Sequence, residues 1–538
     1  MLTLLLILAI SSQGQSLADS GTDFITAFPE NVAYFYPVIP DNSLNITALY
    51  NDTEVNIYFK RLLKLTIILQ QGETGVYLLP SDVEEHKLAV SQKTVNVISN
   101  KNVVVLSISM QGESVQTNVV YPSQNLGTFY SIPQLNYGEM LSKFSQATRS
   151  ISTKYSFFRL LIINPLSLTN EIRIVGKSQI EQFKLQPYTL LQLALNGSEV
   201  SVESLNNVAV IVSHPCLEVT SCKCKMMLNQ LRPDAHWGQS FILPLLNIPT
   251  WLHVTLDTIL TESTLDAGTL ERIKSGAQSI STIYRASLRL ISPGLILEVI
   301  PETMFAACYL VHFSVANGNV SVIAETLSSS ELYIDRSSLS SISWTPIANT
   351  KYSIASVPLQ GRHVIWHPSS KIAVYMFHNM TSGIHHGGPA VVLGEKPDPD
   401  GCSINLDELT VAPTPMSWAQ SHQYCTSTSD ELISPSTVTA HSALTEFLRN
   451  AADTEHWIGL RRSLLTLDWY WQKGNESEDL MDTQWGAGEP SDPVQGMCAS
   501  VFSDMTWKSV SCCSQLKAIC LKKSVYFPLD SPVEGFLV

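Results

Sequence analysis

The chain has 538 residues, of which 45% are hydrophobic and only 15% charged, which is enough apolar material for about three folded domains. A net charge of −14 without any Lys/Arg cluster argues against nucleic acid and anionic membrane surfaces as partners. The ten cysteines, an even number, indicate disulfide bonds and therefore an oxidising compartment.

The N-terminus carries an apolar run, Met1 to Ile10, that is too short to cross a bilayer and is followed by small polar residues as far as Ala18. This pattern predicts a secretory signal peptide over residues 1–18. A buried N-terminal strand is the alternative, but no turn or partner signal precedes the run. Because no later segment has the roughly 20 consecutive apolar residues of a membrane helix, we expect a secreted, extracellular protein with no membrane span.

Asn-x-Ser/Thr sequons are spread along the whole chain and fit export. If they are glycosylated, each asparagine is expected on a surface loop or an exposed strand face. The six sequons begin at Asn45, Asn51, Asn196, Asn319, Asn379 and Asn475.

Residues 19–395 read as strands throughout, with alternating stretches such as 44–49 and β-branched runs such as 103–108. The pattern Val-x-Val-x-Ser, followed after two residues by Asn-Val-x-Val, occupies residues 95–105 and again 200–210. Two strands joined by a polar turn would produce it. A weaker third copy lies at 364–374, although a β-sandwich can repeat such a hairpin by chance. We therefore predict a mainly β region built from two or three sandwich-like units of about a hundred residues each.

Three short segments of this region carry a family resemblance. They are Asp23-Phe-Ile-Thr-Ala-Phe-Pro29, Asn229-Gln-Leu-x-Pro233 and Trp237-Gly-Gln-Ser-Phe-Ile-Leu-Pro244, the last two preceded by Cys216, Cys222 and Cys224. Residues 20–395 resemble the N-terminal domain of the IgGFc-binding protein family, an extracellular, mucus-associated group. The resemblance implies adhesion or recognition outside the cell. The cysteine-rich von Willebrand type D assemblies of larger members do not follow here, and we do not predict Fc binding.

A change in composition marks the boundary to the last quarter of the chain. Residues 383–389 and 396–401 are rich in turn and breaker residues, so we place the boundary near residue 400, with a linker over 396–401. His378, His385 and His386 lie in this stretch without a nearby cysteine or acid, which predicts a solvated loop rather than a metal site.

The C-terminal region carries an ordered series of aromatic and cysteine positions. It consists of Trp457-Ile458-Gly459-Leu460, Trp469-Tyr470-Trp471, Trp485-Gly-Ala-Gly-Glu-Pro490, Cys498, Trp507, Cys512 and Cys520. This series resembles the C-type lectin-like domain and covers residues 402–522, with a tail over 523–538. The resemblance implies an α+β fold, and residues 417–425 and 440–450 read as its helices.

The resemblance also implies two disulfides, Cys425 with Cys520 and Cys498 with Cys512. Cys402 and Cys513 remain, and the simplest hypothesis pairs them, with a vicinal Cys512–Cys513 bond as the rival. In the N-terminal region, Cys216, Cys222, Cys224 and Cys308 leave three pairings open.

Sugar-binding members of the lectin family hold calcium through carboxylate and amide oxygens. Glu489-Pro490 is kept, but Ser491 replaces the amide, no acid precedes Cys498, and Trp507 is followed by Lys508, whose charge opposes a cation. We therefore predict that the domain binds no metal and no cofactor. Calcium-dependent sugar binding is disfavoured but stays open as an alternative. The candidate ligand-loop residues are Glu489, Pro490, Ser491, Asp492, Trp507 and Lys508.

No hydrolase elbow, zinc-protease helix or phosphate loop occurs, so we predict a protein that is not an enzyme. The expected function is that of a secreted recognition or adhesion glycoprotein whose lectin-like domain binds an extracellular protein or glycoprotein surface. One rival is a glycan-binding lectin of innate or mucosal defence, and the other is a structural component of mucus or matrix.

Overall fold

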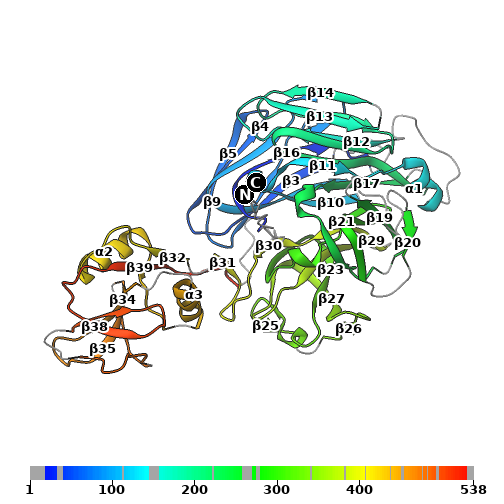
Figure 1. Cartoon of the computed structure of the whole chain (residues 1–538). Coiled ribbons are helices and arrows are strands. Elements are labelled where there is room, and N and C mark those ends of the chain that lie inside the picture. The colour runs from blue at the N-terminus through cyan, green and yellow to red at the C-terminus, as the bar shows by residue number, and fades with distance from the viewer. Residues whose placement is uncertain are drawn as a thin grey trace, which may run out of the picture. The chain divides into compact units, whose positions relative to one another are not determined.

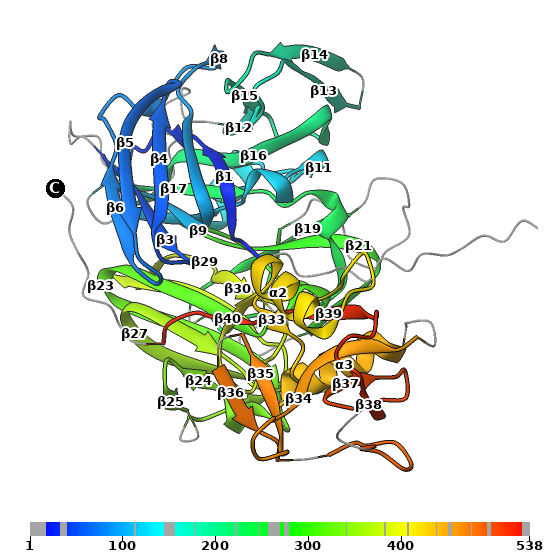
Figure 2. The same ribbon diagram turned by 90° about the vertical axis from the view of Figure 1, so that its left-hand side faces the viewer.

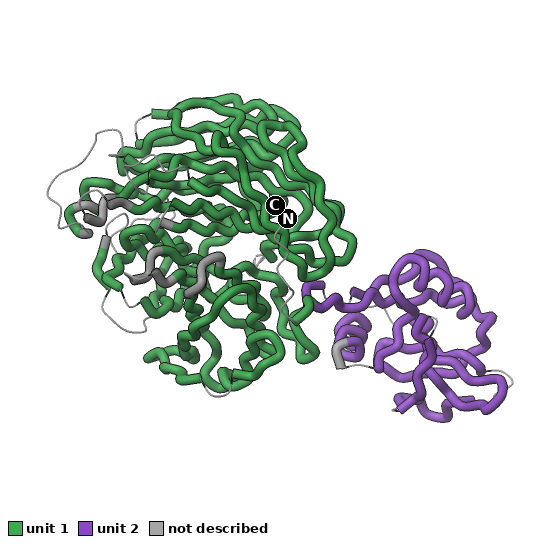
Figure 3. Tube along the Cα trace, turned by 180° about the vertical axis from the view of Figure 1, so that it is seen from behind, with its two compact units in different colours: residues 1–402, 527–538 green, residues 403–526 purple. Residues whose placement is uncertain are grey.

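The computed structural model describes residues 18–32, 40–111, 114–144, 157–177, 179–220, 223–246, 248–256, 270–273, 279–339, 342–380, 383–405, 408–436, 438–449, 454–474, 476–481, 483–491 and 496–529. The chain divides into two compact units (Figure 3): unit 1 comprises residues 1–402 and 527–538, and unit 2 comprises residues 403–526.

Unit 1 begins with a β-sandwich organised around one long strand, β9 (Val95–Gln111). The first part of β9 pairs with β1 and β4, and its second part pairs with β3 and β10, so the same strand belongs to both layers. The outer edges of the two layers are β5 and β6. The other strands are β1 (Gly21–Thr26), β3 (Asp41–Ala48), β4 (Thr53–Phe59), β5 (Leu62–Leu69), β6 (Thr74–Leu78) and β10 (Ser114–Val120).

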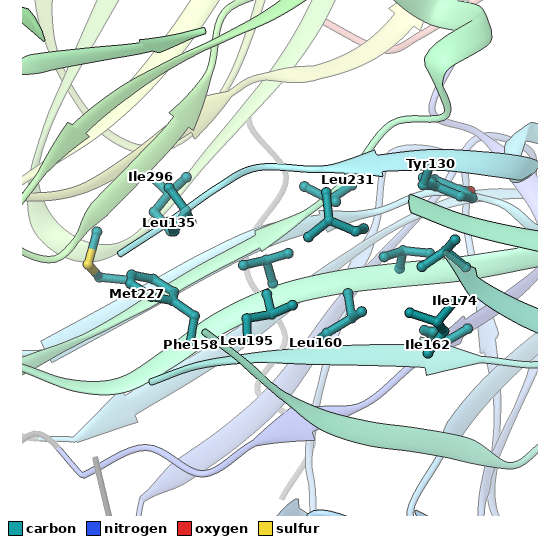
Figure 4. Close-up of a cluster of buried hydrophobic side chains, with 14 of the residues drawn as sticks. Tyr130, Leu135, Phe158, Leu160, Ile162, Ile174, Leu195, Met227, Leu231 and Ile296 are labelled. Atoms are coloured by element: carbon teal, nitrogen blue, oxygen red, sulfur yellow. The ribbon is translucent and has the colours of Figure 1, made fainter. Parts of the chain in front are cut away.

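A second sandwich repeats this arrangement around β16 (Val200–Thr220). The first part of β16 pairs with β11 and β13, and its second part pairs with β12 and β17. Its apolar core is filled from both layers by side chains such as Tyr130, Leu160 and Ile162 (Figure 4). The strands are β11 (Gly127–Ile132), β12 (Phe158–Ile163), β13 (Asn170–Gly176), β14 (Ile180–Leu185), β15 (Leu190–Leu195) and β17 (Lys223–Gln230), and β8 (Val90–Ser91) extends β15.

Two further units follow the same plan. In the third, β21 (Ser279–Ser292) is the long strand, paired with β18, β19 and β22. In the fourth, the long strand is split into β27 (Tyr352–Trp366) and β28 (Ala373–Met380), both paired with β23 (Figure 2). The remaining strands are β18 (Gly238–Ile242), β19 (Trp251–Leu256), β20 (Leu270–Arg272), β22 (Leu295–Glu298), β23 (Cys308–Glu325), β24 (Tyr333–Ile334), β25 (Ser337–Ser338), β26 (Thr345–Pro346), β29 (Gly383–Pro389) and β30 (Val391–Gly394).

The same junction motif precedes each of the last three repeats. A proline begins a short 3-10 turn, and the residue five positions later is small. This residue is Gly127 or Gly238 at the start of β11 or β18, and Ala306 two residues before β23. The small residue is required because a Cβ built on Gly127 would lie 2.5 Å from the Cβ of Pro233, the proline of the following junction. Gly21 and Gly238 face Pro122 and Pro301 in the same way.

The recurrent sequence pattern marks equivalent places in these repeats. Residues 95–105 and 200–210 do not form two strands joined by a turn, as predicted, but one continuous strand at the point where it passes from one layer to the other. The residues at 364–374 occupy the same place: Ile372 pairs with Ala306 as Val208 pairs with Gly127. The copy around Ala286 in the third repeat has no recognisable sequence pattern.

The strand that follows the long strand in each repeat lies at the centre of unit 1 (Figure 1). These strands, β10, β17, β22 and β29, contact one another in a closed cycle. The Gln116 side-chain amide of the first repeat donates hydrogen bonds to the carbonyls of Met226 and Gly294, at 2.9 and 3.0 Å. Asp19 joins the first repeat to the fourth, because Asp19 N donates to Val392 O at 3.0 Å and the Asp19 carboxylate accepts from Val392 N at 2.8 Å. The four repeats therefore form a closed ring.

The histidine prediction requires a correction. Residues 383–389 form strand β29 at the centre of the ring rather than a solvated loop. His378 and His386 are only 1% and 4% exposed, with ring centroids 5.6 Å apart. The side chain of His385 lies outside the described residues.

Unit 2 is a compact α+β fold in which both predicted helices are present. The first, α2 (Trp418–Thr428), begins at a capping box between Ser417 and Gln420, and the second is α3 (Val438–Arg449). Trp457 and Trp418 are buried, and their indole N–H groups donate to the carbonyls of Met416 and Ile458. The strands are β31 (Ser403–Asn405), β32 (Glu408–Val411), β33 (Glu431–Leu432), β34 (His456–Arg462), β35 (Trp469–Lys473), β36 (Glu476–Asp479), β37 (Cys498–Val501), β38 (Trp507–Val510), β39 (Lys517–Lys522) and β40 (Val525–Tyr526).

The disulfides agree with the family pattern inside unit 2, where Cys425 bonds to Cys520 and Cys498 to Cys512. The predicted pairing of Cys402 with Cys513 is wrong. Cys402 bonds to Cys308 of the fourth ring repeat, and the Cys402 carbonyl accepts a hydrogen bond from the Phe527 N–H. Cys513 is a free thiol on an exposed turn. Cys216 is disulfide-bonded, whereas Cys222 and the side chain of Cys224 lie outside the described residues.

Candidate binding site

The loop that corresponds to the calcium loop of the lectin family rests on a cluster of tryptophan rings. Trp485 stacks at a tilt on Trp469, with centroids 4.6 Å apart, and meets Trp507 edge to face at 5.7 Å. The backbone N–H of Gly486 donates to Trp507 O, and the N–H of Trp507 donates to Gln484 O. These contacts fix the start of the loop, which continues through a cis peptide bond between Glu489 and Pro490.

The carboxylate of Glu489 is held by neighbouring serines. Its Oε2 atom accepts from the backbone N–H of Ser491 at 2.9 Å and of Ser509 at 3.0 Å, and also from the Ser509 hydroxyl. Burial acts to raise the pKa of Glu489, but these hydrogen bonds and the charge of Lys508 outweigh it and hold the pKa below its ordinary value. Glu489 is therefore an ionised group whose Oε2 atom is already used inside the protein.

The two serines also bind each other, since Ser491 N and Ser491 Oγ both lie 2.7 Å from Ser509 Oγ. Together with Glu489 they form a hydrogen-bonded group, which we call the serine clasp. Within the described part of the chain, no group of three or more His, Cys, Asp or Glu side chains is arranged to hold a metal ion.

The other candidate residues of this loop have different surroundings. Trp507 is 4% exposed and belongs to the core of unit 2, so it is not a surface ligand residue as predicted. Lys508 and Pro490 are exposed. Asp504 closes its own turn by accepting from the Thr506 hydroxyl and backbone N–H, bonds that lower its pKa. Asp492 lies outside the described residues.

The sequons differ in how far they are accessible. Asn51 and Asn196 are exposed, and Asn319 is half-buried with its amide on the Ser356 hydroxyl. Asn45 contradicts the expectation of a surface position, because it lies in the middle of β3 and is only 4% exposed. Asn475 and the side chain of Asn379 lie outside the described residues.

One exposed feature of unit 2 was missed in the sequence. Leu464, Leu465 and Leu467, in the turn between β34 and β35, are 77%, 96% and 51% exposed. The signal for it was present, since a turn between two strands is normally polar whereas three of the six residues 463–468 are leucine.

Comparison with known protein families gives one match in unit 1 and one in unit 2. Residues 116–255 match the family described as IgGFc binding protein, and residues 414–522 match the lectin C-type domain. The two matches lie where the sequence resemblance placed these families, and both families are binding domains by name. The first match begins in β10 of the first repeat, spans the second repeat and ends in β19 of the third.

Among individual proteins, the human IgGFc-binding protein is 22% identical over 235 residues, which is 42% of this chain and 4% of that protein. The chain thus spans only a small part of that relative's length. Among solved structures, human lithostathine is 23% identical over 22% of this chain and 93% of its own, with a TM-score of 0.20. The mouse scavenger receptor C-type lectin carbohydrate-recognition domain and CEL-I from Cucumaria echinata are each 19% identical over 22% of this chain and 90% of theirs, with TM-scores of 0.20. Among the described residues, no helix has the length and apolar character needed to cross a membrane.

Proposed function

We propose that this chain is a secreted recognition or adhesion glycoprotein that binds an extracellular protein or glycoprotein surface through its lectin-like unit without using calcium, and that it is not an enzyme. The serine clasp carries the proposal. Calcium takes oxygen ligands with free lone pairs, and the Oε2 atom of Glu489 already accepts three hydrogen bonds from Ser491 and Ser509.

To bind in this loop, calcium would have to displace the hydrogen bonds that hold the Glu489 carboxylate. A hydrogen bond to a charged group contributes about 1.5–3 kcal/mol, somewhat less where solvent reaches it, and the cation would have to replace several of them at once. It would also meet the ammonium group of Lys508, whose charge already acts on the Glu489 carboxylate. Both effects oppose a cation in this loop.

The N-terminal ring supports the extracellular part of the proposal. Its match to the IgGFc-binding protein family and its disulfide-bonded cysteines fit an exported protein. The name of the human relative states an IgGFc ligand for that protein, and we do not transfer the ligand to this chain.

A glycan-binding lectin is the second candidate, because Glu489-Pro490 is retained from the sugar-binding pattern. A glycan array, run with calcium and again with a chelator, separates the two candidates. We expect no chelator-sensitive binding. Chelator-sensitive binding that is lost in Glu489→Gln and kept in Asp504→Asn would overturn the proposal, whereas chelator-insensitive glycan binding would refine the ligand to a glycoprotein sugar held elsewhere on the surface.

A further inference from the structure

The turn between β34 and β35 forms an apolar projection on unit 2. The exposed fractions of Leu464 and Leu465, 77% and 96%, leave these side chains almost fully in water. Tyr470 pairs with Asp479, so continuing that antiparallel register places Met481, which is 87% exposed, beside the turn. Leu464, Leu465, Leu467 and Met481 are called the leucine tip below.

The leucine tip is held in shape by its own backbone. The Ser463 hydroxyl accepts from the N–H groups of Leu465 and Thr466, both at 3.2 Å. Ser463 N donates to Asp468 O at 2.8 Å, and Leu467 N donates to Ser463 O at 3.1 Å. The exposure of these side chains is thus a property of a hydrogen-bonded turn.

A rigid support lies behind the turn. Trp469 follows it directly and packs on Trp485, while the guanidinium of Arg462 stacks over the Trp469 ring at 4.7 Å. Apolar side chains gathered at one place on a folded surface, rather than scattered singly, mark an interaction site. A turn whose backbone is held by hydrogen bonds also lowers the entropy cost of binding.

The charges beside the leucine tip define what can cover it. Asp468 closes the turn, and Asp479, which pairs with Tyr470, lies at the end of the neighbouring edge strand β36 that is nearest the turn. Glu478, the next acid along β36, is exposed like Asp468 and Asp479. Lys473 pairs with Glu478 and neutralises only one of these acids. The two arginines of β34 are turned onto aromatic rings, Arg461 over Trp418 and Arg462 over Trp469. The rim of the tip is therefore acidic.

We propose that the leucine tip docks a protein segment that carries both basic and apolar side chains, such as a cationic amphipathic helix. The tip would enter the apolar face of that segment, and the carboxylates of β36 would face its lysines or arginines. Membrane-surface elements carry lysine and arginine around their apolar residues, so an acidic rim favours a basic protein partner over an anionic bilayer. This inference rests on the proposed recognition function and names its site and the chemistry of its partner.

The test uses the full chain and a synthetic amphipathic helix of Lys and Leu, with a Glu/Leu helix of the same pattern as the comparison probe. We expect the Lys/Leu helix to bind, with an affinity that falls as salt is added. Leu464→Ser combined with Leu465→Ser should weaken binding about tenfold or more, the size of loss seen when anchor side chains are truncated. Asp468→Asn combined with Asp479→Asn should weaken binding and reduce its salt dependence.

The matched control is Leu327→Ser, which removes an equally exposed leucine (99%) from unit 1 and should leave binding unchanged. Near-equal binding of both helices, no binding of the Lys/Leu helix, or unchanged binding by the double serine variant overturns the inference. Retention on phosphatidylcholine vesicles that the double serine variant abolishes, without peptide binding, would assign the tip to lipid and also overturn it. Chelator-sensitive glycan binding would refute the proposed function separately, because the leucine variants leave Glu489 untouched.

Discussion

The Nε2 atom of His386 accepts a hydrogen bond of 2.7 Å from the backbone N–H of Thr117, a residue 269 positions earlier in the chain. The bond joins β29 of the fourth repeat to β10 of the first, where the ring closes on itself. An imidazole nitrogen accepts only when it carries no proton, so this contact requires neutral His386.

The ring should consequently lose stability in acid. Burial, and next the neighbouring His378, lower the pKa of His386 to about 3, and burial lowers that of His378 to about 4. In the unfolded chain both imidazoles bind protons below about pH 6.5, whereas in the folded ring they stay neutral down to about pH 4. The neutral histidines therefore contribute fully to the stability of the ring above pH 6.5, and this stability falls as the pH drops towards 4. For each of these two histidines, the free energy of unfolding should fall by about 1.4 kcal/mol per pH unit over this range.

Scanning calorimetry between pH 7 and 4.5 checks this expectation. His386→Gln, whose amide oxygen can still accept from Thr117, should flatten the fall of the unit 1 transition temperature with decreasing pH, whereas His422→Gln in unit 2 should not. An unchanged slope in His386→Gln would contradict the assignment.

Ser509→Ala should destabilise unit 2 by about 1 kcal/mol or more, because it removes the hydroxyl that donates to the partly exposed Glu489 carboxylate and also binds Ser491. Urea unfolding monitored by tryptophan fluorescence measures the change. Ser477→Ala, at an exposed position of β36, serves as the matched control and should be nearly neutral. Equal stability of the two variants would show that the serine clasp does not stabilise the loop.

Tyr130→Phe should cost the ring about 1–3 kcal/mol, because the Tyr130 hydroxyl accepts from the N–H of the half-buried Gly127 and donates to the buried Val208 carbonyl, and both lose this partner. Tyr309 makes the equivalent bonds in the fourth repeat. Chemical denaturation should show a smaller loss for Tyr284→Phe, which removes the same oxygen from a half-buried position. A similar loss in both would refute the role of the hydroxyl.

Cys513 should react with iodoacetamide in the native protein, because it is exposed and free, whereas Cys402 should not, because it is bonded to Cys308. Peptide mapping after labelling locates the modified side chain. Labelling of Cys402, or a linked peptide that contains Cys402 and Cys513, would contradict the observed pairing.

The sequence predicted the β architecture of unit 1 because alternating apolar residues are a local signal. It did not predict that residues 95–105 form one strand, since exposed Asn100 and Lys101, at the point where β9 changes layers, look like a turn. The third repeat was not predicted either, because the residues around Ala286 do not follow the sequence pattern. Only the pairing of Ala286 with Gly238 shows that they occupy the equivalent place. Backbone geometry is kept across the four repeats while side chains vary.

The candidate site could likewise be predicted only in part. The tryptophans and the two disulfides of unit 2 follow from ordered motifs, but the pairing of Cys402 depends on Cys308, 94 residues away, and on how the chain returns at Phe527. The loss of acidic and amide ligands around Glu489 is visible in the sequence. That Ser491 and Ser509 both bind the Glu489 carboxylate is visible only in three dimensions.

Calcium titration of the full chain tests the central claim most directly. With the Glu489 carboxylate held by Ser491 and Ser509, we predict no heat of binding above background at millimolar calcium and the same unfolding temperature of unit 2 in calcium and in chelator. A saturable binding heat together with a higher unfolding temperature in calcium, both absent in Glu489→Gln, would contradict the account.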